Sequence, residues 1–178
     1  DSFIPYVDLP VRAGPIFELA VGSPAAPRAL LRSKGWAVRD PRGPTRDLWA
    51  YERYIRRSKA EFSVAKHGYV ITRSGWFSER SATYLASGRP VLIQGTGFSD
   101  WLQTGRGVMA FNTPEEALAG LDEINGRYGH HCRAARDIAA EYFDAGKVLP
   151  RLIDDAMMHH AGSTGNSPHR PPCGDPVR

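Results

Sequence analysis

Two short apolar runs on either side of a helix-length segment constrain the fold of this chain more than any other feature. The runs are Phe62–Ala65 and Val91–Ile93, and the segment between them, from about Ser78 to Ser87, is followed by Gly88. Two strands joined by a helix form a parallel unit, and helices cover both faces of a parallel sheet. The central stretch therefore predicts a strand, a helix and a second strand in an α/β fold.

Other segments repeat this alternation of strand and helix. We expect strands at residues 36–38 and 108–111, and a strand or short helix at residues 16–21. We expect helices at residues 24–34, 130–144 and 148–157, a helix that Thr45 caps, and a helix at residues 114–124 that Thr113 caps. Alternating apolar strands and amphipathic helices predict a Rossmann-like parallel sheet flanked by helices.

Proline and glycine set the expected domain boundaries. Residues 1–15 contain three prolines and one glycine and begin without Met, so we expect an extended linker that follows a missing upstream half. Residues 16–160 are long enough for one domain with a substantial core. From residue 161 onward Gly, Pro and Ser dominate, and we expect residues 161–178 to be a disordered tail.

Composition excludes several classes of function. The hydrophobic share of 42% and the charged share of 24% are typical of a soluble globular protein. No apolar stretch approaches the roughly 18 residues of a membrane span, and the first residues, DSFIPYVDLP, do not have the pattern of a signal peptide. The net charge is +4, but basic residues are scattered among acidic ones, so we predict no nucleic-acid partner. Cys132 and Cys173 indicate no disulfide framework or zinc site, and a reducing, cytoplasmic compartment is expected.

The loop from Ser74 to Arg80 is the first candidate site. Ligands of open α/β sheets bind beyond the carboxyl ends of the strands, where this loop lies. Ser78 is the expected helix cap, and a helix N-terminus favours phosphate. Gly75 allows close approach of a ligand to the backbone, and Arg80 offers a fork of donors to a diphosphate. Alternatively, Glu79 in the first turn already complements the helix end and no anion binds.

A second candidate loop follows the next strand at the same edge of the sheet. Gln94, Thr96 and Gly97 offer an amide, a hydroxyl and backbone N–H donors, although this sequence is also an ordinary turn. Lys66 follows the first strand, where it is either a phosphate partner or a solvated loop residue. Trp76 either stacks on a ligand ring or closes the core beneath the loop.

The histidines do not predict a metal site. His130–His131 and His159–His160 lack the i, i+4 spacing of metal ligands on a helix, so we interpret both pairs as surface residues. Ser78 lacks the Gly-x-Ser-x-Gly setting of a hydrolase nucleophile.

The residues from Ser58 to Phe98, SKAEFSVAKHGYVITRSGWFSERSATYLASGRPVLIQGTGF, resemble the donor-binding half of GT-B glycosyltransferases, which use nucleotide-sugars. The similarity lies in the Gly-aromatic loop, the helix that ends in LASGRPVL and the TG turn after the next strand. Later segments, GVMAF, TPEEA and EYF, are similar as well, so the resemblance covers roughly Leu30 to Ile153.

The resemblance implies one half of a two-domain hexosyltransferase whose active site lies between two Rossmann-like halves. This chain is similar to the carboxyl-terminal half, which binds the nucleotide-sugar. The resemblance implies an amino-terminal half as partner, typically the side that binds the acceptor, an unidentified acceptor and no bound metal or other cofactor. It assigns a donor site but no catalytic residue. The predicted site residues are Lys66, Ser74, Gly75, Ser78, Glu79, Arg80, Tyr84, Gln94, Thr96 and Gly97.

The chain departs from the family at one point. Many retaining members carry two glutamates eight positions apart, and these positions fall on Gly75 and Thr83 here. Arg80 and Tyr84, one helical turn apart, are the expected replacement in this branch. The missing glutamates keep a second hypothesis open, a non-catalytic nucleotide- or sugar-binding module. A third hypothesis is another α/β enzyme that binds phosphate at the same strand ends.

Overall fold

The computed structural model describes residues 2–163, and for residues 159–163 it describes the backbone only. The chain divides after Tyr142 into two compact units. The first unit contains all strands found among the described residues, and the second contains helix α8 (Ala145–Ser163). Within residues 2–163, no helix combines the length and apolar character that crossing a membrane requires.

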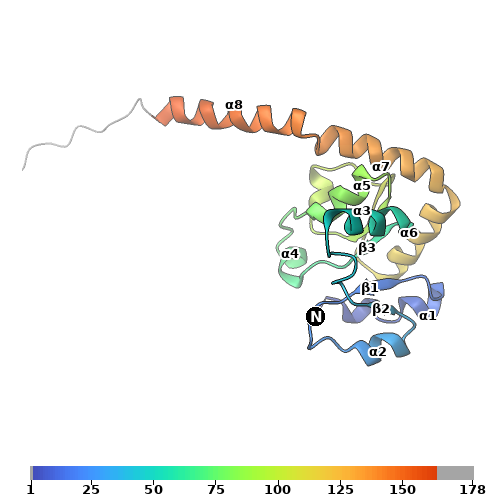
Figure 1. Ribbon diagram of the computed structural model, residues 1–178. Coiled ribbons are helices and arrows are strands. Elements are labelled where there is room, and N and C mark those ends of the chain that lie inside the picture. Colours follow the sequence, from blue (N-terminus) through green and yellow to red (C-terminus); the bar gives the residue numbers. More distant parts are fainter. Residues whose placement is uncertain (1, 164–178) are drawn as a thin grey trace, which may run out of the picture. The chain divides into compact units, whose positions relative to one another are not determined.

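The first unit contains two small parallel sheets. Strands β1 (Glu18–Ala20) and β2 (Ala37–Arg39) form one, and β3 (Glu61–Ser63), β4 (Val91–Gln94) and β5 (Val108–Phe111) form the other, in the order β3-β4-β5 (Figure 1). The predicted α/β, Rossmann-like architecture is confirmed. The single sheet that we expected is instead divided, and aromatic side chains join the two parts.

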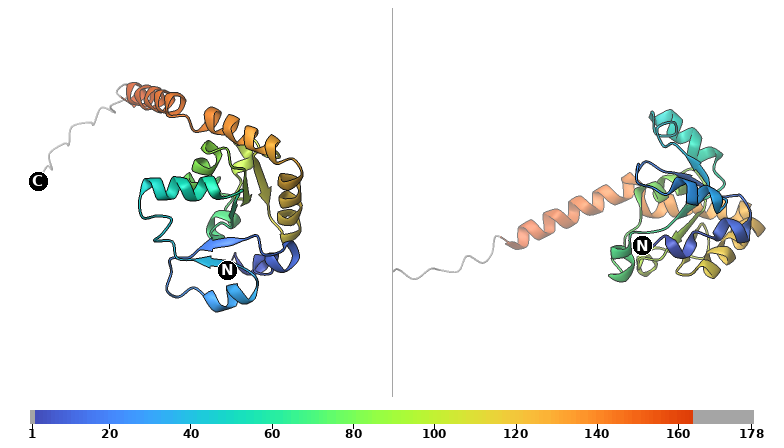
Figure 2. Two further views of the ribbon diagram at one scale, coloured as in Figure 1. Left: turned by 45° about the vertical axis from the view of Figure 1, so that its right-hand side comes forward. Right: turned by 90° about the horizontal axis from the view of Figure 1, so that it is seen from below.

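The register of the larger sheet places one apolar row on one face. Phe62 pairs with Leu92, and Leu92 pairs with Met109. This row packs into one cluster with residues of helix α6 (Pro114–Gly126). The helix lies so close to the sheet that a Cβ added at Gly120 would be only 2.7 Å from Leu92 Cδ1. Helix α5 (Glu79–Ala86) contacts β4 and packs against α7 (Tyr128–Tyr142), so helices flank the sheet (Figure 2).

Aromatic rings connect the two sheets. Phe17, just before β1, lies with its ring centroid 5.1 Å from that of Phe62 on β3. Trp36, just before β2, lies 5.9 Å from the same ring, and Phe62 stacks on Phe111 of β5 at 5.4 Å. Because these contacts are made by side chains, the sheets share a core without sharing a ladder of hydrogen bonds.

The amino-terminal residues are part of the fold, so the prediction of an extended linker at residues 1–15 was wrong. They form a turn of 3-10 helix, η1 (Ile4–Tyr6), and helix α1 (Leu9–Ala13). Tyr6 and Leu9 are each only 2% exposed, and Tyr6 donates a 2.7 Å hydrogen bond to the carbonyl of Asn112. Pro5 and Pro10 lie in the first turns of these elements, where proline is tolerated. Whether an upstream half precedes this segment stays a prediction.

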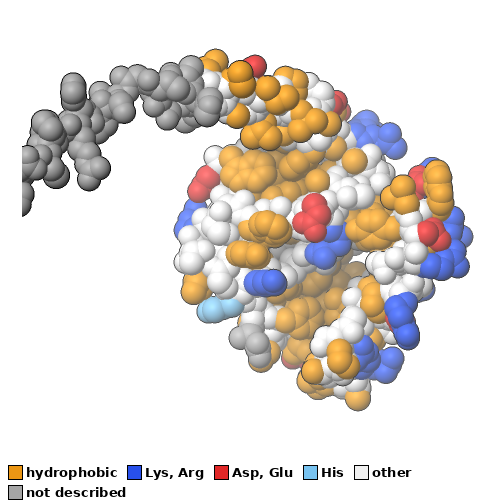
Figure 3. Space-filling model, turned by 60° about the vertical axis from the view of Figure 1, so that its left-hand side comes forward, with side chains coloured by type: hydrophobic (Ala, Val, Ile, Leu, Met, Phe, Trp, Pro, Cys, Tyr) orange, Lys and Arg blue, Asp and Glu red, His pale blue; other side chains and the backbone are white. Residues whose placement is uncertain are grey.

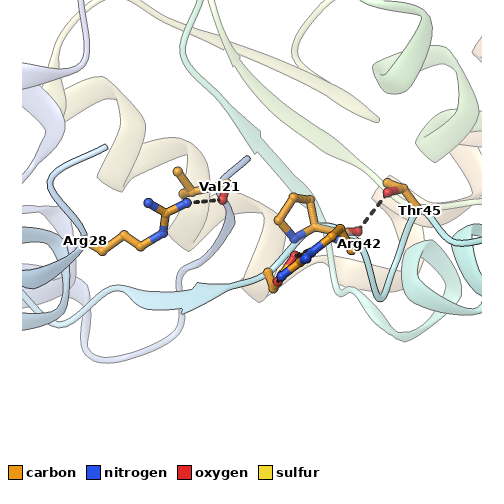
Figure 4. Close-up of polar contacts among 6 residues, drawn as sticks. Val21, Arg28, Arg42 and Thr45 are labelled. Atoms are coloured by element: carbon orange, nitrogen blue, oxygen red, sulfur yellow. Dashed lines mark hydrogen bonds and ion pairs between the residues drawn. The ribbon is translucent and has the colours of Figure 1, made fainter. Parts of the chain in front are cut away.

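The helix caps were predicted correctly in two places and wrongly in one. Ser78 and Thr113 cap α5 and α6 as expected. Helix α3 (Leu48–Arg57) is capped by Asp47, whose carboxylate accepts from the Ala50 N–H, rather than by Thr45. The Thr45 hydroxyl instead donates to the Pro41 carbonyl and closes the preceding turn (Figure 4).

The remaining helices are short. They are α2 (Arg28–Ser33), α4 (His67–Ile71) and the 3-10 turn η2 (Phe98–Asp100). The Arg28 guanidinium bonds back to the Val21 carbonyl at 2.8 Å (Figure 4). Helix α8 extends to Ser163, so residues 161–163 are helical rather than disordered, and residues 164–178 of the predicted tail lie outside the described residues.

His131 is fully buried, so its interpretation as a surface residue was wrong, whereas His130 is exposed as expected. The Gly107 N–H donates to His131 Nδ1 at 3.1 Å. A neutral ring that accepts at Nδ1 carries its proton on Nε2. That nitrogen faces Glu123 Oε1 at 3.3 Å, so the ring links the turn before β5 to α6.

We expect Leu9→Ala to lower the free energy of unfolding by about 2–5 kcal/mol, because it opens a cavity in the shared core. Val11→Ala in the same helix is the matched control, since Val11 is 70% exposed and its truncation leaves no cavity. Urea unfolding of both variants measures the difference. Equal stability of the two variants would show that residues 1–15 do not contribute to the core.

Candidate ligand-binding site

A cavity of about 190 Å³ lies where β3 and β4 end and α5 begins. It brings together five of the predicted site residues, which come from three separate segments of the chain. They are Lys66, Ser78, Arg80, Gln94 and Thr96. The carboxyl ends of parallel strands are the usual place for ligands in α/β folds, and the structure places this cavity there. Whether it binds a ligand stays a prediction.

The amino-terminal turn of α5 forms one wall. Ser78 caps the helix, and its hydroxyl accepts from the Arg80 N–H at 3.2 Å. Ser81, three positions later, also lines the cavity and is 1% exposed. Its hydroxyl has no hydrogen-bond partner among residues 2–163. Buried hydroxyls are normally hydrogen-bonded, so this group is available to a ligand.

Ser81 was missed in the sequence, although its spacing from the cap could have identified it. A residue three positions after the cap lies in the first helical turn, where backbone N–H groups are also without helical partners. Glu79 lies in the same turn but is exposed and does not line the cavity. Even if Glu79 complements the charge of the helix end, it contributes no carboxylate to the wall of the cavity.

Hydrogen bonds hold the two candidate loops together. The Gly75 N–H donates to the Thr96 carbonyl at 2.8 Å, and the Thr96 hydroxyl donates to the Trp76 carbonyl at 2.6 Å. The Trp101 indole N–H donates to the Gly75 carbonyl at 3.1 Å. The Thr96 proton, predicted to face a ligand, is thus used within the protein. These bonds fix the shape of the cavity before any ligand binds.

Three predicted site residues support the loops and do not line the cavity. Gly97 has a φ of +91°, and a Cβ there would lie 3.0 Å from the Arg73 carbonyl oxygen. A Cβ at Gly75 would lie 3.5 Å from Trp101 Nε1. The hydroxyl of Ser74 accepts a long hydrogen bond, 3.4 Å, from the Trp76 N–H. The glycines therefore permit close contact between loops rather than between backbone and ligand.

Gln94 also serves the protein framework. Its amide oxygen accepts from the Ala65 N–H at 3.1 Å, and its amide nitrogen faces the Tyr6 hydroxyl at 3.3 Å. The side chain is 8% exposed. It ties the end of β3 to the amino-terminal segment, which explains a polar residue at the end of a buried strand.

Arg80 forms an ion pair that the sequence did not indicate. Its Nε lies 2.6 Å from Glu61 Oε1, and its terminal nitrogen donates to the Ser63 hydroxyl at 2.8 Å. The Glu61 side chain is 4% exposed, whereas that of Arg80 is 50% exposed. A buried carboxylate requires such a partner, because removing one member of the pair leaves an uncompensated charge. Arg80 therefore stabilises β3 as well as facing the cavity.

A second cavity, of about 970 Å³, shares Arg80 and Ser63 with the first. It is bounded by β1, α3, β3 and α6, and Tyr84 lines it rather than the small cavity. Tyr54, Phe17 and Phe62 supply aromatic surface. On the face shown in Figure 3, hydrophobic side chains gather in a hollow, and Lys and Arg side chains lie at its border.

Burial raises the pKa of Tyr51, Tyr54 and Tyr84, and Tyr51 and Tyr84 also interact electrostatically with Arg80 and Glu61. For Tyr54 a hydrogen bond with Glu18 raises the pKa further. The phenols are therefore neutral hydrogen-bonding groups at neutral pH. Within residues 2–163, no group of His, Cys, Asp and Glu is arranged to hold a metal ion.

Comparison with known proteins adds no identification. The chain matches no family model, and no curated protein and no solved structure shows significant similarity to it.

We expect Gly97→Ala to destabilise the protein more than Gly105→Ala. Both glycines have a φ near +90°, at a cost for alanine of roughly 1–2 kcal/mol, but only Gly97 has a backbone atom within contact distance of the new Cβ. Urea unfolding measures both values. Equal losses would show that the contact with Arg73 can relax at no cost.

We expect stability to fall as the pH rises above about 10, the ordinary pKa of tyrosine. Unfolded tyrosines ionise there while the buried ones stay protonated, so the unfolded state binds fewer protons and gains stability. Below that pH the contribution is fully present. Tyr54→Phe should reduce the slope of unfolding free energy against alkaline pH. An unchanged slope would contradict the raised pKa.

Proposed function

We propose that this chain is the nucleotide-sugar-binding, carboxyl-terminal half of a GT-B glycosyltransferase. The observation that carries the proposal is the small cavity at the amino-terminal turn of α5, with the available Ser81 hydroxyl in its wall and Lys66 at its exposed side. The resemblance in residues 58–98 supplies the class of ligand. The cytoplasm remains the proposed compartment, from the scarcity of cysteine.

A diphosphate suits this cavity chemically. The first turn of a helix presents N–H groups without helical partners and a partial positive charge. Ser81 adds a hydroxyl donor, and Lys66 adds a full positive charge. At about 190 Å³ the cavity is smaller than the roughly 300–1,000 Å³ of sites for whole drug-sized ligands. The cavity therefore holds the diphosphate, and the rest of the donor extends beyond it.

In this proposal the domain stabilises the leaving group. When the bond between the anomeric carbon and the phosphate oxygen breaks, negative charge develops on the nucleoside diphosphate. In this proposal the helix end and Lys66, which line the same cavity, offset that charge. Arg80 contributes less than the sequence predicted, because Glu61 already balances much of its charge. If the enzyme inverts the anomeric configuration, the acceptor hydroxyl attacks the anomeric carbon and its proton passes to a base of the amino-terminal half.

A non-catalytic binding module is the second candidate. Two observations favour it: the glutamate positions of many retaining members are Gly75 and Thr83, and Arg80 is committed to an ion pair. A module would bind the same ligand without turnover. Release of nucleoside diphosphate from a bound nucleotide-sugar, followed over hours, separates the two candidates.

We expect Lys66→Ala to weaken binding of UDP or GDP about tenfold, or about 1.4 kcal/mol, in calorimetric titration. Arg80→Ala is a poor test, because it strands the buried Glu61 and destabilises the fold. Lys66 is exposed and caps α4 without a side-chain hydrogen bond, so its truncation leaves the fold intact.

Lys59→Ala is the matched control for this titration. Lys59 carries the same charge but lines the larger cavity, and its ammonium lies over the Tyr128 ring. A loss in Lys66→Ala alone supports the site at α5. Equal losses in both variants would indicate general electrostatic attraction, and the absence of binding to either nucleotide would refute the proposal.

A further inference from the structure

Glu61 has one carboxylate oxygen without a partner, and it lines the larger cavity. Oε1 pairs with Arg80, but Oε2 is buried and has no hydrogen-bond partner among residues 2–163. The Glu61 side chain is only 4% exposed, and the cavity that it lines has a volume of about 970 Å³. Leaving a buried acceptor unsatisfied costs free energy, and more so for a charged group. A ligand with an O–H or N–H donor in this cavity would remove that cost.

Two arginines of α3 bring positive charge to the same cavity. Arg53 and Arg57 both line it, and their spacing of four positions places them on one face of the helix. Within residues 2–163 neither has a carboxylate at ion-pair distance, whereas Arg39, Arg46 and Arg80 of the same lining each have one. Neither lines the smaller cavity, so an anion that they bind is distinct from a diphosphate at α5.

The rest of the lining favours a polar ring over an aromatic one. The Phe62 ring already contacts the rings of Phe17 and Phe111, at 5.1 and 5.4 Å, so it belongs to the core. The Ser63 hydroxyl accepts from Arg80 and therefore has its own proton to donate, and Asn125 adds an amide to the lining. Hydroxyl and amide groups match the hydroxyls of a sugar, whereas little aromatic surface is left for a nucleobase.

We propose that the larger cavity binds a sugar phosphate, with its phosphate at Arg53 and Arg57 and one sugar hydroxyl donating to Glu61 Oε2. Guanidiniums offer phosphate oxygens paired, charged N–H donors. Glu61 follows Arg57 by four positions, so their Cα atoms are at most roughly 14 Å apart. A phosphorylated sugar together with the two side chains spans that distance.

This inference goes beyond the proposed function and does not depend on it. The sugar phosphate is neither the donor nor the acceptor of the transfer reaction, but a separate ligand of this domain. Because Arg80 and Ser63 line both cavities, a sugar phosphate in the larger one lies beside a diphosphate in the smaller one. The two ligands therefore bind at the same time.

Calorimetric titration of the full chain with glucose 6-phosphate, mannose 6-phosphate and ribose 5-phosphate tests the proposal. We expect at least one of them to bind about tenfold more tightly than inorganic phosphate and than the unphosphorylated sugar, because the site contacts both groups. Equal affinity for inorganic phosphate would indicate general attraction of anions to the arginines, and it would overturn the sugar contact at Glu61.

Arg57→Gln should weaken the sugar phosphate about tenfold, because it removes charged donors to the phosphate. Arg56→Gln is the matched control. Arg56 is the preceding residue of the same helix and is also exposed, but it does not line the cavity and pairs with Glu52 at the surface. Equal losses in the two variants would place the phosphate elsewhere and overturn the proposal.

Glu61→Gln should also weaken the sugar phosphate about tenfold, because an amide is a weaker acceptor than a carboxylate. Glu18→Gln should change the affinity less than twofold, since Glu18 lines the same cavity but is bonded to Arg39 at 2.9 Å. If Glu61→Gln fails to fold by circular dichroism, deoxy derivatives of the bound sugar phosphate replace it, and loss of one hydroxyl should weaken binding to the unmodified chain about tenfold. Full affinity in every deoxy derivative would overturn the contact with Oε2.

Titrations with UDP and GDP separate this inference from the proposed function. A sugar phosphate that stays bound in saturating nucleotide supports two separate sites. Displacement of the sugar phosphate by the nucleotide places the donor in the larger cavity and overturns the separate site. Nucleotide binding without any sugar phosphate binding overturns this inference alone, and the reverse result overturns the donor site alone.

Discussion

The ion pair between Glu61 and Arg80 is the interaction on which the rest of the site depends. It joins the first residue of β3 to the first turn of α5, across 19 positions of sequence. Glu61 is almost fully buried, so the pair is fixed at its acidic end, whereas Arg80 reaches solvent. A buried pair of this kind adds little net stability, because the cost of removing charges from water offsets their attraction. Its value lies in position, since Arg80 lines both cavities.

That position limits what Arg80 can do. An arginine whose Nε and one terminal nitrogen are engaged has part of its donor fork left for a ligand. Its charge is also partly balanced, so an incoming diphosphate meets a weaker field than the sequence suggests. The Ser81 hydroxyl and Lys66 are free of such compensation among the described contacts. The physical argument for anion binding therefore moves from the guanidinium to these two side chains.

Local signals in the sequence predicted the frame of the site well. The caps at Ser78 and Thr113 and the strand at Val91–Ile93 follow from neighbouring residues, and the structure contains them. Long-range contacts were not predictable in this way. The bond from Tyr6 to Asn112 spans 106 positions, and nothing near Tyr6 marks it as a core residue. The prolines of residues 1–15 led to the prediction of a linker. Proline is also tolerated in the first turn of a helix, and whether such a helix forms here depends on packing that the sequence does not display.

The same distinction applies to the carboxylates. Aligning the chain on the helix of the resemblance places Gly75 and Thr83 where many retaining members have glutamates, which suggests a site without acidic groups. The fold supplies a carboxylate from another element, because β3 brings Glu61 against the start of α5. One of its oxygens is occupied and the other is not, so it can position only a single donor group. Inspection of the helix sequence alone would miss Glu61, because Glu61 is close to the helix in space but not in sequence.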